Sequence, residues 1–165
     1  MKFTIRKIVP ADNARVAHII RTVMPEYDCV GPRYSISDPE VDDMYAAYSA
    51  PRSAFYAVVE QEDESIYGVG GYGPLVGSEA NVCELRKMYF LPQARGHGMG
   101  SKLLQTCIDG ARKDGFKFMY LETVFRMVEA EGLYRKFGFK DLDGPMGNTG
   151  HSACDHFMML ELQLV

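Results

Sequence analysis

The segment Phe90-Leu91-Pro92-Gln93-Ala94-Arg95-Gly96-His97-Gly98-Met99-Gly100-Ser101 is the most informative stretch of the 165-residue sequence. Residues 81–91 read as a strand, and apolar residues recur at helical spacing from Leu103 to Ala111. The segment therefore predicts a strand, a tight turn with alternating glycines, and a helix. Helix amino termini expose unpaired N–H groups and a partial positive charge, and glycines let a phosphate approach the backbone closely. We interpret the turn as a site for an anionic, phosphate-bearing cofactor.

Two common phosphate-binding motifs do not fit this turn. A P-loop needs Lys followed by Ser or Thr after its last glycine, whereas Gly100 precedes Ser101 and Lys102, and Arg95 stands where the first glycine belongs. The dinucleotide pattern needs glycines spaced by two and then three residues, early in a βαβ unit. Here the glycines are spaced by two and two, in the middle of the chain. A turn that merely joins a strand to a helix remains the alternative for the glycines alone.

Outside this segment, apolar periodicity, Pro and Gly predict the remaining elements. They are a strand at 3–9, a helix capped by Asp12 and stopped by Pro25, a loop at 27–39, a helix at 41–48, strands at 55–60, 66–76 and 118–121, a helix at 130–137 ended by Gly138, and a strand at 157–164. The predicted order is β, α, α, β, β, β, α, β, α, β, β, in which one of the two strands after the helix at 130–137 has no assigned range. It indicates an α/β (α+β) three-layer fold with one mixed sheet, and we expect a single domain over residues 1–165.

The strand at 81–91 has no cleanly apolar face. Strict alternation places Glu84 and Arg86 together with Met88 and Phe90, and it places Lys87 on the opposite face. A carboxylate and two cations among large apolar residues predict that part of one face looks into a cleft.

Composition and charge exclude several classes of protein. With 18 Lys and Arg against 22 Asp and Glu, the net charge is -4 and the pI is near 5.6, which argues against binding nucleic acid or an anionic membrane. The 4 cysteines form no CxxC pair, so we expect reduced thiols. The amino terminus does not read as a signal peptide, and no run of 18 apolar residues follows. We therefore expect a cytoplasmic protein without a membrane anchor.

The glycine-rich turn, with Met88 to Pro92 before it, resembles the acetyl-coenzyme A loop of GNAT-type N-acetyltransferases. The family pattern is Gln or Arg, two residues, Gly, any residue, then Gly or Ala. A later segment, 133–139, resembles the family's Leu-Tyr-x-x-x-Gly-Phe motif, and the order of elements agrees over nearly the whole chain. The resemblance implies that acetyl-coenzyme A is bound by the strand end and the loop, namely Met88, Tyr89, Phe90, Arg95, Gly96, His97, Gly98, Met99, Gly100 and Ser101.

The resemblance implies transfer of an acetyl group from acetyl-coenzyme A to a primary amine, by direct attack in a ternary complex. Glu84 is then the first choice for the base, with Glu122 in reserve, and Tyr134 is the expected general acid. From the residues alone, Glu84 could instead form an ion pair with Arg86 or Lys87, and Tyr134 could simply pack in a helix.

The acceptor, a small molecule or a peptide, is not identified by the sequence. Candidate acceptor contacts are Tyr27, Arg33, Tyr34 and His151, with Tyr45 and Tyr48 as further possibilities. No metal is expected, because His151, Cys154 and His156 do not converge in the predicted arrangement. Many family members carry a cofactor-contacting Asn where this chain has Met127, so Thr123 or Arg126 would have to supply that contact.

Three further possibilities stay open at this level. The chain could be a coenzyme A-binding regulatory or partner module with little catalysis. It could transfer a longer acyl group, if the glycines of the strand at 66–76 make room for one. It could also form a homodimer through its terminal strand.

Overall fold

The computed structural model describes residues 1–163 and contains one mixed seven-stranded sheet with the order β1-β2-β3-β4-β5-β7-β6. The strands are β1 (Phe3–Lys7), β2 (Ala54–Glu60), β3 (Ile66–Pro74), β4 (Val82–Phe90), β5 (Phe118–Thr123), β6 (Lys140–Asp141) and β7 (His156–Glu161). The helices are α1 (Asn13–Val23), α2 (Met44–Ala47), α3 (Met99–Lys113) and α4 (Val128–Lys136). The order of helices and strands along the chain is the predicted one, and the predicted fold class is confirmed.

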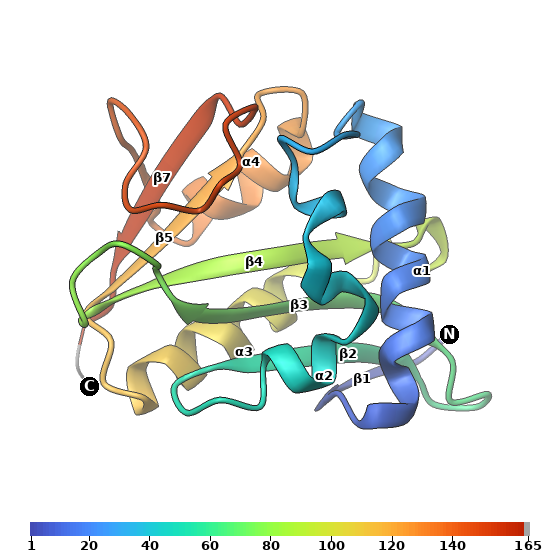
Figure 1. Cartoon of the computed structure of the whole chain (residues 1–165). Coiled ribbons are helices and arrows are strands. Elements are labelled where there is room, and N and C mark those ends of the chain that lie inside the picture. The colour runs from blue at the N-terminus through green and yellow to red at the C-terminus, as the bar shows by residue number, and fades with distance from the viewer. Residues whose placement is uncertain (164–165) are drawn as a thin grey trace.

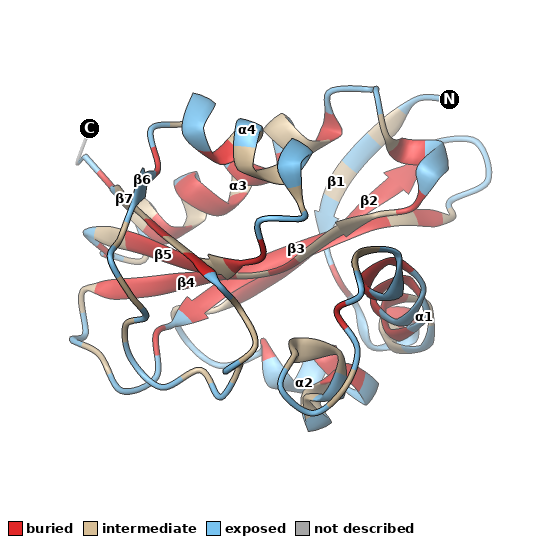
Figure 2. Ribbon diagram, turned by 90° about the horizontal axis from the view of Figure 1, so that it is seen from above, coloured by how far each residue is buried: buried red, intermediate tan, exposed pale blue. Residues whose placement is uncertain are grey.

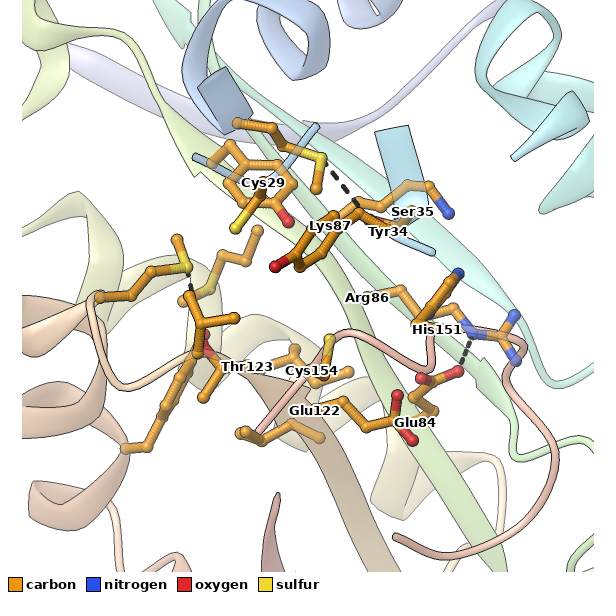
Figure 3. A pocket seen from close by; sticks show the side chains of 18 residues that line it. Cys29, Tyr34, Ser35, Glu84, Arg86, Lys87, Glu122, Thr123, His151 and Cys154 are labelled. Carbon is orange, nitrogen blue, oxygen red and sulfur yellow. Dashed lines mark hydrogen bonds and ion pairs between the residues drawn. The ribbon is translucent and has the colours of Figure 1, made fainter. Parts of the chain in front are cut away.

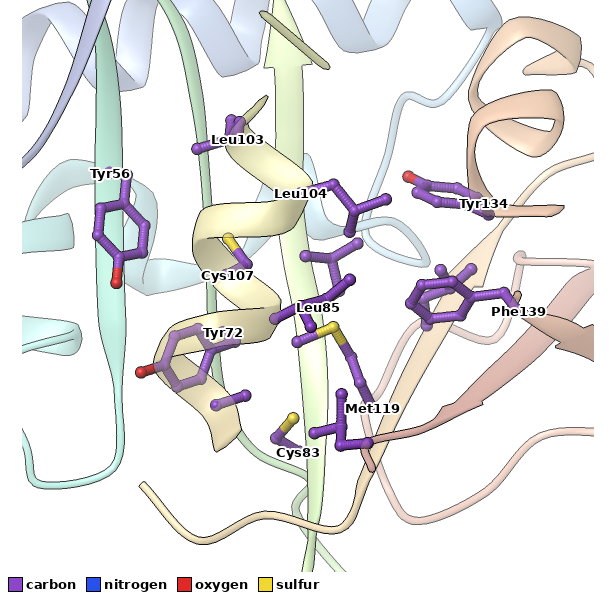
Figure 4. Packing of buried hydrophobic residues seen from close by; sticks show 14 of the residues in the cluster. Tyr56, Tyr72, Cys83, Leu85, Leu103, Leu104, Cys107, Met119, Tyr134 and Phe139 are labelled. Carbon is purple, nitrogen blue, oxygen red and sulfur yellow. The ribbon is translucent and has the colours of Figure 1, made fainter. Parts of the chain in front are cut away.

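The sheet is sandwiched between two layers of helices (Figures 1 and 2). On one face, α1 and α2 cover the side chains of Phe55, Ala57 and Val59. On the other face, Tyr56 and Val58 pack toward α3, and the same core continues to Tyr134 in α4 (Figure 4). Every residue of β2 is buried, because alternate side chains of this strand enter the two cores.

Local sequence explains where α3 and α4 end. Gly115, with φ +85°, follows α3, and Gly138, with φ +97°, follows α4. After α4, the Phe139 N–H donates to the Tyr134 carbonyl at 3.0 Å, and the two rings lie 5.7 Å apart. Both predicted helix ends are confirmed.

Two helix starts and one strand end differ from the sequence prediction. The Asp12 side chain does not cap α1, because its carboxylate binds Arg6 at 2.7 Å and the Val9 N–H at 2.8 Å. The predicted helix at 41–48 is only α2, because the Asp43 side chain caps a new start by accepting from the Ala46 N–H. The terminal strand ends at Glu161, and position 164 of its predicted range lies outside the described residues.

A bulge in β4 changes the predicted faces of that strand. Val69 pairs with Tyr89 and Gly71 with Arg86, so the register shifts between them. Lys87 sits at the shift with φ +48°, a conformation that non-glycine residues seldom adopt. As a result Met88 and Phe90 pack into the α3 core, while Lys87 joins Glu84 and Arg86 on the opposite face. The prediction that Met88 and Phe90 share a face with Glu84 was wrong, since strict alternation ignores the extra residue.

The bulge lies where the sheet opens. β4 and β5 are parallel and pair only from Val82 with Phe118 to Glu84 with Tyr120. Beyond that pair the two strands diverge, with β5 turning toward α4 (Figure 1). Main-chain groups of β4 after Glu84 are therefore not paired with β5.

The glycines of β3 serve close packing. An added Cβ at Gly68 would lie 2.5 Å from the Phe90 ring, and one at Gly71 would lie 2.2 Å from the Ala54 carbonyl oxygen. The space beside these glycines is already filled by neighbouring strands. The idea that they make room for a longer acyl chain therefore finds no support in their surroundings.

Within the described residues, the longest helix is the 15-residue α3, and no helix has the length and apolar character needed to cross a membrane.

Candidate active site

The glycine-rich turn forms one wall of an open groove. Gly96 and Gly98 have φ +78° and +72°, and a Cβ added at either would meet no atom within 4 Å. Their backbone thus borders open space at the amino terminus of α3, where the first N–H groups lack intrahelical partners. The groove has a volume of about 270 Å³. The free N–H groups that border the groove suit a phosphate-bearing ligand.

Most of the predicted cofactor-binding residues line this groove. They are Met88, Tyr89, Phe90, Arg95, Gly96, Gly98, Met99, Gly100 and Ser101. His97 instead packs edge-on against Phe3, with ring centroids 5.3 Å apart. The Arg95 guanidinium donates to the Phe90 carbonyl and pairs with Glu26 at 2.8 Å, so it ties the turn to the segment after α1.

A second, narrow cavity of about 60 Å³ lies on the α1 side of β4, where β4 and β5 diverge (Figure 3). Three residues, Met88, Tyr89 and Met127, line both this cavity and the groove. The two spaces therefore lie side by side, next to the bulge in β4. Four of the predicted catalytic and acceptor residues also line the narrow cavity: Glu84, Tyr34, His151 and Tyr134.

Glu84 is a buried carboxylate in this cavity. Its Oε1 accepts from Arg86 Nε at 2.7 Å, along the same face of the same strand. Burial raises the pKa of Glu84, the charge and hydrogen bond of Arg86 oppose that rise, and the charge of Glu122 adds to it. The ion pair considered at the sequence level is present, and the net pKa remains raised, as a base for ammonium groups requires.

Glu122 and His151 converge on Glu84. One ligand atom from each of the three side chains lies within 4.8 Å of the other two. Glu122 accepts hydrogen bonds from the Tyr120 and Thr149 hydroxyls, both at 2.7 Å. This cluster is the one group of His, Cys, Asp and Glu side chains within the described residues with the spacing of a cation site. The sequence prediction considered His151 with Cys154 and His156, which is a different set.

Tyr134 reaches the cavity from the other side of the sheet. Its ring packs against Phe139, and burial raises the pKa of its hydroxyl. A neutral phenol is therefore the stable form at this position, and a neutral phenol can donate a proton.

A buried lysine fastens the loop that covers the cavity. The side chain of Lys87 is 2% exposed, and its ammonium group binds Asp38 at 2.7 Å and also Glu40. Asp38 in turn binds His151 Nε2 at 3.0 Å. Asp38 therefore joins three chain segments: the loop before α2, the bulge in β4, and the loop before β7. Lys87 was considered only as a partner for Glu84, and Asp38 was not predicted as a site residue. The one signal in the sequence was a lysine within an apolar strand.

The remaining candidate acceptor residues are dispersed. Tyr27 lines the groove beside the glycine-rich turn, and Tyr34 lines the narrow cavity. Arg33 is exposed and binds Ser152. Tyr45 and Tyr48 line a larger cavity of about 560 Å³ between β2 and the end of α3, and the Tyr48 hydroxyl also donates to Glu40 at 3.2 Å.

Met127 stands where many family members carry an asparagine, and its neighbours there are apolar or neutral. Met127 Sδ lies 3.5 Å from the Thr123 hydroxyl, which donates to it. Arg126 donates to the Tyr27 carbonyl at 2.9 Å and lies near the Tyr34 hydroxyl. Thr123 thus lines the narrow cavity, and Arg126 contacts Tyr27, which lines the groove.

Comparison with known sequences places this architecture in a family. Residues 17–139 match the model of the acetyltransferase (GNAT) family. The chain is 44% identical over 158 residues to the uncharacterized N-acetyltransferase YjgM of Escherichia coli, covering 95% of this chain and 93% of that one. It is also 33% identical to an IAA acetyltransferase of Azospirillum brasilense, over 61% of this chain and 64% of the relative.

Solved structures share the fold. A GNAT-family acetyltransferase from Staphylococcus aureus superposes with a TM-score of 0.82 at 18% identity, covering 98% of this chain and all of the other. YncA of Salmonella typhimurium, solved with acetyl-CoA, gives a TM-score of 0.74 at 22% identity, with 98% and 94% coverage. At these identities the likeness concerns the fold.

Proposed function

This chain belongs to the GNAT family of acetyltransferases, and we propose that it transfers the acetyl group of acetyl-coenzyme A to a primary amine in a ternary complex. The observation that carries the proposal is that the groove and the narrow cavity lie side by side and share the lining residues Met88, Tyr89 and Met127. A phosphate-bearing cosubstrate in the groove could extend its arm to this junction. An amine entering the cavity would meet it there, beside Glu84.

In the groove, the cosubstrate's pyrophosphate would be bound by N–H groups of the turn and of the first turn of α3. The positive φ of Gly96 and Gly98 and the free space beside them support this role. When bound, the cosubstrate supplies the activated acetyl thioester. Main-chain N–H groups on the edge of β4 beyond Glu84, where β4 no longer pairs with β5, would be suited to polarising its carbonyl group.

In the cavity, the acceptor amine must lose a proton before it attacks. Glu84 takes one proton from the ammonium group, directly or through a water molecule. The amine nitrogen then forms a bond to the acetyl carbon, the carbon–sulfur bond breaks, and Tyr134 gives its proton to the departing thiolate. The acetylated nitrogen gives up its remaining extra proton, through water, to the Tyr134 phenolate, and Glu84 releases its proton to solvent, so both residues return to their starting states. No metal ion takes part in this proposed sequence.

The first experiment is calorimetric titration of the protein with acetyl-coenzyme A, followed by an assay for free thiol with a panel of amines. We expect micromolar one-to-one binding and amine-dependent thiol release. Binding without thiol release, unaffected by changes to Glu84 or Tyr134, would favour the coenzyme A-binding module instead. A folded protein that binds neither acetyl-coenzyme A nor coenzyme A would refute both functions. Propionyl and succinyl thioesters in the same assay test the choice of acyl group.

A further inference from the structure

We propose that the cavity between β2 and the end of α3 binds a small organic molecule that carries an oxyanion group, either a carboxylate or a phosphate. This cavity, of about 560 Å³, shares no lining residue with the groove or with the narrow cavity. Its volume lies within the range typical of small-molecule sites. Neither Glu84 nor the glycine-rich turn contributes to it, so the site does not depend on the proposed acetyl transfer.

Positive charge predominates in this cavity. Its charged lining residues are three cations, Lys7, Arg52 and Lys113, and one carboxylate, that of Asp114. The lining thus carries an excess of two positive charges, in a chain whose net charge is -4. The Asp114 carboxylate is also engaged, because it accepts from the Tyr72 hydroxyl at 2.6 Å. The field in the cavity therefore attracts anions.

Arg52 is held in a fixed orientation at the cavity wall. Its Nε donates to the Asp114 carbonyl at 3.1 Å, and its guanidinium carbon lies 3.9 Å from the centre of the Phe116 ring. The carbonyl contact uses the Nε donor, so the two terminal nitrogens remain to bind two oxygens of one oxyanion. A guanidinium group that is already fixed by stacking and by a hydrogen bond loses little side-chain entropy when such a ligand binds.

Two buried tyrosine hydroxyl groups lie beside the same part of α3. A Cβ added at Gly110 would lie 2.7 Å from Tyr72 Oη and 3.0 Å from Tyr56 Oη, so both hydroxyls lie against the last turns of the helix (Figure 4). Burial raises the pKa of Tyr56 to about 12. Its hydroxyl is therefore neutral at ordinary pH and can donate to a bound anion.

Lys7 and Lys113 flank these hydroxyl groups. Lys7 pairs with Tyr56 across β1 and β2, so the two side chains point to the same face of the sheet. Lys113 follows Gly110 by three residues in α3 and therefore lies on the same side of the helix. A cation at the carboxyl terminus of a helix also stabilises the helix dipole. Lys7 belongs to a strand, where that effect is absent, so the positive field exceeds what the helix end requires.

Aromatic rings line the rest of the cavity. They are the exposed ring of Tyr45 and the buried rings of Tyr48 and Phe55. A ligand with an apolar body can place its oxyanion near Arg52 and its apolar part against these rings. Inorganic phosphate would use only the charged part of the cavity. The occupant is therefore an organic carboxylate or a phosphate ester.

The test follows backbone amide signals by NMR while benzoate or phenyl phosphate is added at constant ionic strength. The amides of Arg52 and Gly110 report on this cavity, and those of Gly96 and Gly98 report on the groove. We expect saturable shifts at Arg52 and Gly110 with at least one probe, and the tighter probe identifies the oxyanion as carboxylate or phosphate. Benzamide has the same ring and no charge, and we expect it to bind at least about tenfold more weakly.

Three variants complete the test with the tighter probe. Lys7→Gln/Lys113→Gln removes two of the three positive charges, and we expect it to weaken binding by about tenfold or more. Lys2→Gln/Lys140→Gln is the matched control, because it changes the net charge equally at exposed lysines outside the cavity, and it should leave binding unchanged. Arg52→Lys keeps the charge and removes the paired donors, and we expect it to weaken binding by about fivefold or more.

Several results would overturn the site. They are the absence of saturable shifts at Arg52 and Gly110 with both probes, shifts confined to Gly96 and Gly98, and equal binding of benzamide. An equal affinity of the two double-lysine variants, or an unchanged affinity in Arg52→Lys, would also overturn it. The four lysines are exposed, so the double variants should keep the wild-type fold and test the site even if Arg52→Lys does not fold.

Discussion

Glu84 and Arg86 form a buried ion pair along one face of β4, with Arg86 Nε 2.7 Å from Glu84 Oε1. The charge and hydrogen bond of Arg86 keep the Glu84 carboxylate ionised more readily than burial alone would. The ion pair therefore controls the pH range in which Glu84 can act as a base.

We expect Glu84→Gln to lower kcat/KM for amine acetylation by about 10²-fold, because an amide cannot accept the proton. Steady-state thiol release at saturating acetyl-coenzyme A measures this effect. Calorimetry with acetyl-coenzyme A is the control, and its affinity should be unchanged. A Glu84→Gln enzyme with wild-type kcat/KM would show that Glu84 serves only the ion pair.

Replacing Arg86 tests the pH dependence. Glu84 acts as a base only when ionised, so kcat/KM should rise with pH through its raised pKa. Arg86→Met removes the group that opposes the effect of burial, and the pKa of Glu84 should rise further. We expect the acidic limb of the pH profile to move to higher pH, by about one unit or more. A limb that stays in place, or moves to lower pH, contradicts the assignment of Glu84 as the base.

Tyr134→Phe should separate chemistry from packing. The Tyr134 ring is buried against Phe139, so phenylalanine preserves the packing. We expect a fall in kcat of about 10²-fold with a change in unfolding free energy below about 1 kcal/mol. Urea denaturation measures the change in unfolding free energy. A variant that unfolds more easily but turns over normally would assign Tyr134 to the core alone.

Gly98→Ala and Gly115→Ala form a matched pair for the cofactor groove. Both glycines have positive φ, +72° and +85°, and an added Cβ at either meets no atom within 4 Å. Each substitution should destabilise the protein by about 1 kcal/mol through backbone strain. We expect Gly98→Ala to weaken acetyl-coenzyme A binding in calorimetry in addition, since only Gly98 borders the groove. Equal affinity in the two variants would count against phosphate binding at this turn.

The fold could be read from the sequence because its signals are local. Glycine and proline mark the element ends, apolar spacing marks α1 and α3, and the turn before α3 connects strand to helix as predicted. The alternation rule failed at Lys87, because Lys87 lies in a bulge. The position of the bulge depends on how β4 pairs with β3, and the sequence of β4 alone does not indicate it.

The site was predictable only in part for a related reason. Glu84 and Tyr134 were predicted from the family resemblance and both line the narrow cavity, whereas the contacts of Asp38 with Lys87 and His151 join segments 49 and 113 residues apart. Pairings at such separations depend on how the loops cross the sheet. Single-sequence patterns contain no information on that crossing.

The His151–Asp38 contact predicts a pH-dependent stability. Burial acts to lower the pKa of His151, but the hydrogen bond and charge of Asp38 outweigh it, and the pKa is raised in the folded protein. The stability contributed by protonated His151 is therefore fully present below the unfolded-state pKa of about 6.5, and it is lost as pH rises through the folded-state pKa.

We accordingly expect His151→Asn to reduce the unfolding free energy by about 1–2 kcal/mol at about pH 6, and by clearly less at about pH 9. Urea denaturation at the two pH values measures the difference. His18→Asn is the control, because His18 is exposed on α1 and its side-chain neighbour is Thr22. A His151→Asn effect that is equal at both pH values would mean that His151 contributes packing only. A larger effect at the higher pH would mean that the neutral ring is the form that the folded protein prefers.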